Sequence, residues 1–108
     1  VILGFRDSDF GHIIENIVYF ELLRRGYDVT IGKNDSLEVD FIATNSNDKK
    51  YYQVTYTMLD EDVKNRECRV LKNINDNYEK IVITMDKIYN NTSEEGIKIK
   101  YLIDFLLE

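Results

Sequence analysis

Ile81-Val82-Ile83-Thr84-Met85 is the stretch of sequence that decides the fold. This run is continuous, apolar and rich in β-branched residues, which is typical of a strand that is covered on both faces. A sheet with two covered faces needs a helical layer on each side. The run therefore predicts an α/β domain.

Three strand signals precede this run, over residues 27–31, 37–44 and 51–58. Each is rich in β-branched or aromatic residues, as strands are. Residues 32–36 and 45–48 separate them and have the small polar composition of turns. The short spacing favours neighbouring strands joined by tight connections.

Two helices are expected, one before the strands and one after them. The apolar residues of the first recur at helical spacing and cover far more than one stripe, so we predict that this helix is mostly buried. They are Phe10, Ile13, Ile14, Ile17, Val18, Phe20, Leu22 and Leu23. Gly26 is a typical stop for this helix. The second helix begins near Asp60–Asp62, has one apolar stripe (Val63, Val70, Leu71, Ile74) and closes at Asn75–Asn77.

The remaining sequence adds a small appendage. Residues 90–96 are expected to form a loop, 97–101 a further strand, and 102–107 a short helix or tail. The order is α-β-β-β-α-β, which predicts a mixed central sheet with the first and second helices on its faces.

Length and composition limit the possible functions. The 108 residues suit a single domain over 1–108, and 14 basic against 20 acidic residues give a net charge of −6. A domain that binds nucleic acid mainly by neutralising phosphates is expected to be basic, so bulk charge argues against that mode. No apolar run is long enough for a membrane span. One cysteine (Cys68) and one histidine (His12) exclude a disulfide framework and a zinc finger, and a single cysteine favours a reducing, cytoplasmic location.

Five polar residues stand out against this apolar background. Glu15 lies in the apolar first helix, while Glu38 and Asp40, like Gln53 and Thr55, are two apart on one strand. Residues two apart on a strand share a face, so a hairpin of these strands would place the two pairs side by side. Carboxylate and amide oxygens are the ligands that Mg²⁺ and Mn²⁺ prefer, and such a metal can activate water.

Each of these residues also has a purely structural interpretation. Glu15 has His12 one turn earlier as an ion-pair partner. Glu38 and Asp40 suit a solvated strand face, and Gln53 and Thr55 suit a polar one. Cys68 is expected to be a small packed residue on the second helix.

Several stretches together resemble a known family: Gly11 to Tyr27, Glu38-Val39-Asp40-Phe41, Tyr52-Gln53-Val54-Thr55, residues 76–86 and residues 103–107. Over residues 4–107 the pattern resembles the C-terminal domain of unknown function that follows an AAA+-type ATPase module in many bacterial and archaeal proteins. The order of helix acid, glycine, strand aspartate and paired strand positions is similar to the PD-(D/E)XK nuclease superfamily. That superfamily includes restriction endonucleases and archaeal Holliday-junction resolvases.

The resemblance implies a restriction-endonuclease-like αβββαβ core and a catalytic set of Glu15, Asp40, Gln53 and Thr55. Glu15 takes the place of the helix acid and Asp40 that of the motif aspartate, while Gln53 stands where the second carboxylate would be. The implied ligands of Mg²⁺ or Mn²⁺ are Glu15, Asp40 and Gln53. Thr55 replaces the motif lysine and supplies no charge, and losing such an electrostatic contact costs about a hundredfold or more in rate. Lys64 and Arg66 on the second helix, and Lys33 in a nearby turn, are the candidate substitutes for that lysine.

We therefore expect an accessory C-terminal domain, covalently linked to an upstream ATPase module, with a degenerate nuclease-like site that binds a partner or nucleic acid without efficient cleavage. Because the chain opens on Val1 and not on methionine, we expect it to be a fragment of a longer protein. One alternative is an active Mg²⁺-dependent DNA nuclease that uses Glu15, Asp40 and Gln53. Another is a structural oligomerisation module whose acids face solvent.

Overall fold

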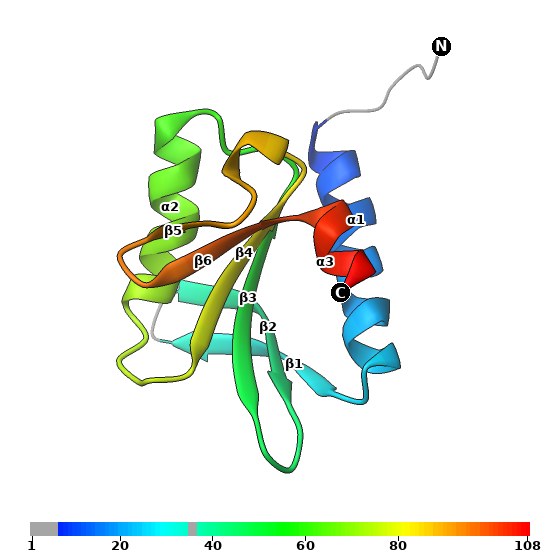
Figure 1. Cartoon of the computed structure of the whole chain (residues 1–108). Coiled ribbons are helices and arrows are strands. Elements are labelled where there is room, and N and C mark those ends of the chain that lie inside the picture. The colour runs from blue at the N-terminus through cyan, green and yellow to red at the C-terminus, as the bar shows by residue number, and fades with distance from the viewer. Residues whose placement is uncertain (1–6, 35–36) are drawn as a thin grey trace.

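A six-stranded sheet lies between two helical layers, as Figure 1 shows. The computed structural model describes residues 7–34 and 37–108. The elements in chain order are α1 (Asp7–Arg24), β1 (Asp28–Asn34), β2 (Leu37–Thr44), β3 (Lys49–Thr55), α2 (Glu61–Lys72), β4 (Glu79–Thr84), the 3₁₀ helix η1 (Lys87–Tyr89), β5 (Thr92–Glu94), β6 (Ile97–Tyr101) and α3 (Leu102–Leu107).

The sheet is mixed, as predicted, with the strand order β1-β2-β3-β4-β6-β5. The pairs β1–β2, β2–β3 and β5–β6 are antiparallel, while β3–β4 and β4–β6 are parallel. The central β4 contains most of the run that predicted the fold, and Ile81–Thr84 are buried. Ile81 and Ile83 pack into one core and Val82 into the other, so the prediction of a strand covered on both faces is confirmed.

The two cores lie on opposite faces of the sheet. Helices α1 and α3 cover one face and α2 the other, which confirms the predicted placement of the first and second helices. The first core contains Val18, Leu22 and Phe105, and the second contains Cys68 and Leu71. Cys68 is 1% exposed and serves as a packed apolar residue, as expected.

The predicted end of α1 is also confirmed. Gly26 has φ +90°, a conformation that costs glycine little. The N–H of Gly26 donates to the carbonyl of Leu23 (2.9 Å), and the N–H of Tyr27 donates to the carbonyl of Leu22 (3.1 Å). This hydrogen-bond pair is the Schellman motif, and it turns the chain from the helix into β1.

The prediction that α1 is mostly buried is wrong. Ile14, Val18 and Leu22 are buried against the sheet, but Phe20 remains 65% exposed and Ile13 44% exposed. The apolar periodicity does not stop at the side of the helix that the sheet covers. Consequently half of an apolar helix faces outward in this chain.

Several element boundaries differ from the expected ones. β1 continues through Gly32 to Asn34, into the predicted turn, and β3 ends at Thr55 and not at Met58. The helix α2 ends at Lys72, before the expected stop. The segment 90–96 is not all loop, because Thr92–Glu94 form the short strand β5 beside β6. These residues are polar and few, so they carry no strand periodicity.

A β-bulge in β2 positions the candidate site. The pairing of β1 with β2 shifts from Thr30↔Ile42 to Gly32↔Val39, so Ile31 faces two residues of β2, Asp40 and Phe41. A bulge bends its strand and changes where side chains point. Val39 accordingly packs in the α2 core while Ala43 packs in the α1 core. Gly32 fits opposite this bend because a Cβ there would lie 2.4 Å from Ile42 Cδ1.

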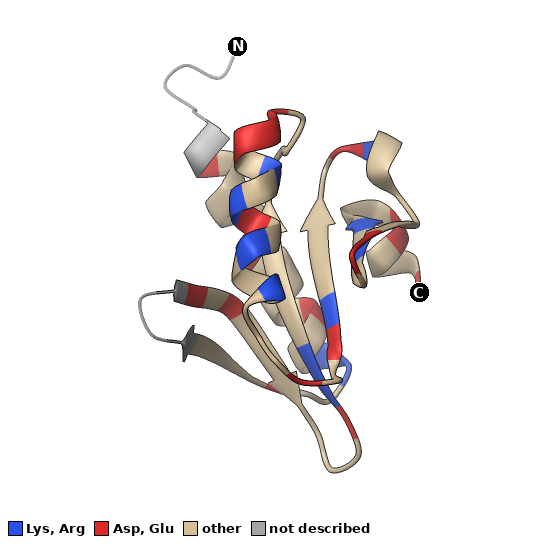
Figure 2. Cartoon of the chain, turned by 90° about the vertical axis from the view of Figure 1, so that its left-hand side faces the viewer, with Lys and Arg blue, Asp and Glu red and all other residues tan. Residues whose placement is uncertain are grey.

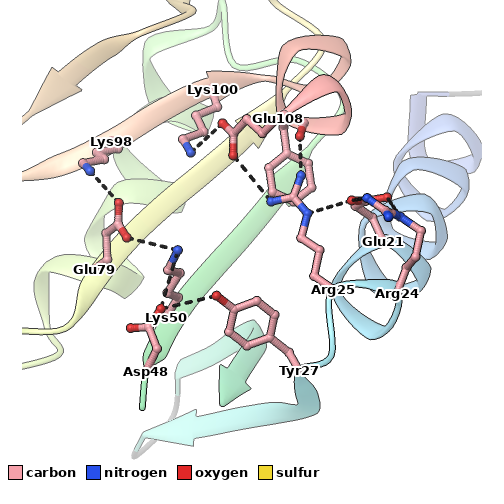
Figure 3. A network of polar contacts seen from close by, with 11 residues as sticks. Glu21, Arg24, Arg25, Tyr27, Asp48, Lys50, Glu79, Lys98, Lys100 and Glu108 are labelled. Atoms are coloured by element: carbon pink, nitrogen blue, oxygen red, sulfur yellow. Dashed lines mark hydrogen bonds and ion pairs between the residues drawn. The ribbon is translucent and has the colours of Figure 1, made fainter. Parts of the chain in front are cut away.

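An ion-pair network joins the end of α1 to α3 and to the sheet (Figure 3). Arg25 donates to Glu21 (2.7 Å), to the carbonyl of Phe105 (2.5 Å) and to Glu108 (3.4 Å). Arg24 adds a second pair to Glu21 (2.6 Å). These contacts hold the C-terminal helix against the α1 side of the sheet.

Candidate functional site

The candidate site begins where β2 and β3 separate. Their backbone pairing runs as far as Phe41↔Tyr52. Beyond that pair, the N–H of Asp40 donates to Gln53 Oε1 (2.7 Å), and the N–H of Val54 donates to Asp40 Oδ2 (2.8 Å). Each of the two motif side chains thus satisfies a backbone donor of the opposite strand, which lets the strands diverge without unpaired N–H groups.

Helix α2 contributes a further carboxyl to this point. Gln53 Nε2 donates to Glu67 Oε2 (2.8 Å), and Gln53 itself is only 4% exposed. Both ends of the Gln53 amide are therefore engaged, one by β2 and one by α2. Glu67 lies within the apolar stripe of α2, and an acid in such a stripe is the sequence signal that points to it.

Glu15 approaches the same point from the opposite helical layer. Its carboxylate lies 3.6 Å from His12 Nδ1, so the predicted His12 pair is present. The charge of Glu15 also raises the pKa of both Asp40 and Glu67. The structure thus links Asp40, Gln53 and Glu67 by hydrogen bonds and places Glu15, from the opposite layer, in a cleft with Val54 and Thr55.

Two of these carboxyls have raised pKa values. Burial raises the pKa of Asp40 to about 6, with the charges of Glu15 and Glu38 adding to it and the Val54 hydrogen bond opposing it. Burial likewise raises the pKa of Glu67 to about 7, and the neighbouring Asp40 adds to the effect. Perturbed carboxyls that gather in one place are typical of functional sites.

A cleft of about 380 Å³ opens beside these carboxyls. Its walls include Glu15 and His12 of α1, Thr55 at the end of β3, and Arg66 of α2. The Thr55 hydroxyl donates to the carbonyl of Thr57 (3.0 Å), so the position of the motif lysine holds a neutral group that already has a partner.

The two helix candidates for the missing cation lie in different places. Arg66 lines the cleft, and its charge lowers the pKa of Glu67, which burial raises. Lys64 instead pairs with Glu94 (2.9 Å) and lies 4.9 Å from the centre of the Tyr89 ring. The side chain of Lys33 lies outside the described part of the chain.

Asp86 supports the rim of the cleft, a role that the sequence interpretation missed. Its carboxylate accepts from the Thr57 hydroxyl (2.8 Å), from the N–H of Met58 (2.6 Å) and from the Thr84 hydroxyl (3.1 Å). Asp86 thereby fixes the segment after β3 to the end of β4. The residue follows a strand directly, which is the one sequence feature that could have indicated it.

The geometry does not form a ready divalent-cation site. Within residues 7–34 and 37–108, no three His, Cys, Asp or Glu side chains are grouped so that they could hold a metal ion. Of the three implied ligands, Gln53 directs its amide oxygen at the N–H of Asp40, and Asp40 directs one oxygen at the N–H of Val54. Mg²⁺ requires close octahedral oxygen coordination, which this arrangement does not match.

The fold and site define an α/β domain with a mixed sheet and a group of half-buried carboxyls beside β2 and β3. No family model matches this chain, and no solved structure gives a significant match. An uncharacterized protein from Haemophilus influenzae is 42% identical to it over 106 residues, which are 98% of this chain and 26% of that protein. The chain thus spans about a quarter of the length of this relative.

No helix in the described part of the chain has the length and apolarity needed to cross a bilayer.

Proposed function

We propose that this chain is an accessory domain of a longer AAA+-type ATPase, built on a restriction-endonuclease-like core, whose nuclease-like site binds a partner without efficient cleavage. One observation carries the proposal: Asp40 and Gln53 occupy the motif positions but spend their polar atoms on the backbone of β2 and β3. Groups that hold two strands together are poorly placed to bind a reacting phosphate.

The residue at the motif-lysine position supports the same conclusion. Thr55 donates its hydroxyl to a backbone carbonyl and carries no charge, and Arg66 reaches the cleft from a different element. A fixed cation at that position normally offsets charge that develops in the transition state. A relocated cation does not reproduce that geometry, so cleavage is expected to be slow or absent.

Charge favours a protein over a nucleic acid as the bound partner. The chain carries −6 overall, the cleft is lined by Glu15 and Arg66, and the charge of Arg66 acts on the neighbouring Glu67. A phosphate backbone would meet excess negative charge there, whereas nucleic-acid binding relies on excess positive charge. Binding of nucleic acid is therefore an outcome of the test and not its expected result.

The test is a cleavage assay with Mg²⁺ or Mn²⁺ on junction, flap and single-stranded DNA. We expect no cleavage by the natural chain. The control variant is Glu15→Gln and not Asp40→Ala, because Asp40 also holds the N–H of Val54 and its loss would disturb the fold.

Three results bear on the proposal. Cleavage that disappears in Glu15→Gln would show an active nuclease and overturn it. Salt-sensitive binding to nucleic acid without metal would replace the protein partner by a nucleic acid. New cleavage in Thr55→Lys, with none in Thr57→Lys, would support a nuclease-like site that has lost its lysine.

A further inference from the structure

The outer side of α1 is an apolar surface with nothing packed on it in the described chain. We call it the outer α1 face: Ile13 (44% exposed), Ile17 (38%), Phe20 (65%) and Leu23 (41%). Their spacing places all four side chains on one side of the helix, opposite the buried Ile14, Val18 and Leu22. Helices that are apolar on all sides are normally buried on all sides.

Helix α2 shows what a solvated outer side looks like in the same chain. Its exposed positions include Arg66, Arg69 and Lys72, and Figure 2 shows basic residues along the side of α2 that faces the viewer. Both helices cover the same sheet, so covering a sheet does not by itself require an apolar outer side. The outer α1 face therefore calls for a separate explanation.

The apolar surface continues from α1 onto the edge of the sheet. Tyr19 and Phe41, whose ring centres are 5.9 Å apart, line a cavity of about 570 Å³ between α1 and β1. Ile31 lines the same cavity and is 68% exposed, on the strand that forms one edge of the sheet. Exposed apolar side chains gathered in this way are typical of an interaction site.

Two observations favour another part of the same polypeptide as the occupant. The Haemophilus relative matches nearly all of this chain with 26% of its own length, so that protein has ample chain to cover this face. A net charge of −6 opposes the association of two copies. A covalently tethered domain acts at an effective concentration in the millimolar range, so an apolar face of modest size is enough to dock it.

We infer that the outer α1 face and the adjoining cavity dock on an apolar surface of a neighbouring domain in the longer polypeptide. Phe20 is the central anchor, because it is the most exposed large residue of the four. This inference rests on the proposed function only in placing the segment within a longer protein, and it does not depend on nuclease or ATPase chemistry.

Thiol labelling in the full-length polypeptide tests the inference. Phe20→Cys and Leu59→Cys are a matched pair, since Phe20 is 65% and Leu59 63% exposed in this chain, and Ile88→Cys (76%) is a second reference. We expect a maleimide, read by mass spectrometry of the labelled peptide, to react about tenfold or more slowly at Phe20→Cys, because it must wait for the domains to open. Asn16→Cys, at the border of the surface, keeps all four apolar side chains and should also be protected.

The outcomes distinguish a neighbouring domain from a second copy of this chain as the occupant of the outer α1 face. Equal labelling of Phe20→Cys, Asn16→Cys and the two references would overturn the inference. Protection that is lost on dilution, together with a dimer by light scattering, would show that a second copy covers the face and would also overturn it. Because the cleavage assay is independent of labelling, equal labelling with no cleavage would refute the docking inference alone.

Discussion

Two groups of carboxyls in this molecule have opposite electrostatic behaviour. In the network of Figure 3, the hydrogen bond from Arg24 is the main cause that lowers the pKa of Glu21 to about 2. Beside β2 and β3, burial raises the pKa of Asp40 to about 6 and that of Glu67 to about 7. The difference lies in the partners: Glu21 has two guanidinium groups, whereas Asp40 and Glu67 have a backbone donor, an amide and other acids close by.

The two groups of carboxyls contribute to stability in opposite ways as the pH changes. A carboxylate whose pKa is lowered contributes stability above its ordinary pKa, and this contribution is lost as pH falls toward the lowered value. A carboxyl whose pKa is raised has the opposite effect, because the ionised form is unfavourable in the folded state. The ionised Glu21 therefore favours folding at neutral pH, whereas the ionised forms of Asp40 and Glu67 oppose folding there.

The largest expected effect comes from Arg25→Met. This change leaves Glu21, which is 10% exposed, with one cation fewer and removes the donor to the carbonyl of Phe105. Breaking such a partly buried pair is expected to lower the free energy of unfolding by about 3 kcal/mol. Urea denaturation measures the loss.

Arg24→Met is the matched control, because Arg24 shares the partner Glu21 but is 66% exposed. A much smaller loss is expected for it, because solvent screens an exposed ion pair. Equal losses for the two variants would contradict the view that Arg25, and not the ion pair as such, joins α1 to α3.

The second-largest effect tests whether the Asp40 side chain stabilises the fold by accepting a hydrogen bond from β3. Asp40→Ala removes the acceptor for the N–H of Val54, whereas Asp40→Asn keeps an oxygen there, and both variants are neutral. We expect the alanine variant to be less stable than the asparagine variant by about 2 kcal/mol in urea denaturation. Glu15→Ala and Glu15→Gln should differ much less, and a similar gap at both positions would argue against a special role for Asp40.

The third effect is a gain in stability. Glu67→Gln keeps an acceptor for Gln53 Nε2 but removes a carboxyl whose pKa is raised from 4.5 to about 7. At pH 8 the natural chain must hold this group ionised, so the variant should be more stable by about 1 kcal/mol. The gain should shrink as pH falls through 7 and vanish below 4.5, where the natural side chain is protonated in both states. A gain that did not change with pH would contradict this explanation.

The smallest expected effect is a shift in the pKa of Glu67 when Arg66 is replaced. Because the charge of Arg66 lowers the pKa of Glu67, Arg66→Met should move that pKa upward from about 7. Lys64→Met should leave it unchanged, since Lys64 is paired with Glu94. A carbon-detected NMR titration of the Glu67 carboxyl distinguishes the two variants, and an upward move in both would reject the assignment of Arg66 to the cleft.

Apart from η1 and β5, the order of the elements could be predicted from the sequence because it depends on local patterns. The run at residues 81–85 predicted a strand covered on both faces, and Gly26 predicted the end of α1. Both reflect backbone and solvation preferences of a few adjacent residues. The approach of Glu15 to Asp40 was inferred from a resemblance, and no contact between the two side chains tests it; burial, with a smaller contribution from the charge of Glu15, raises the pKa of Asp40.

Other features depend on contacts that a single sequence does not display. Apolar periodicity in α1 indicated a covered helix. It did not indicate whether the residues that cover its outer side belong to this segment or to another part of the polypeptide. The bulge at Asp40 and Phe41 leaves no compositional mark, since the extra residue matters only relative to β1. The backbone role of Gln53 followed from that bulge and was therefore equally hidden.

The extra residue in β2 has a consequence for how this protein and its relatives diverge. Before the bulge, the odd-numbered Val39 packs in the α2 core. After the bulge, the odd-numbered Ala43 packs in the α1 core, so the alternation of sides is reversed. Loss of one codon between Val39 and Ile42 would exchange inward and outward positions over a whole half-strand. Related sequences are therefore expected to have no deletion between these residues. They are also expected to keep Gly32 and Asp40 together.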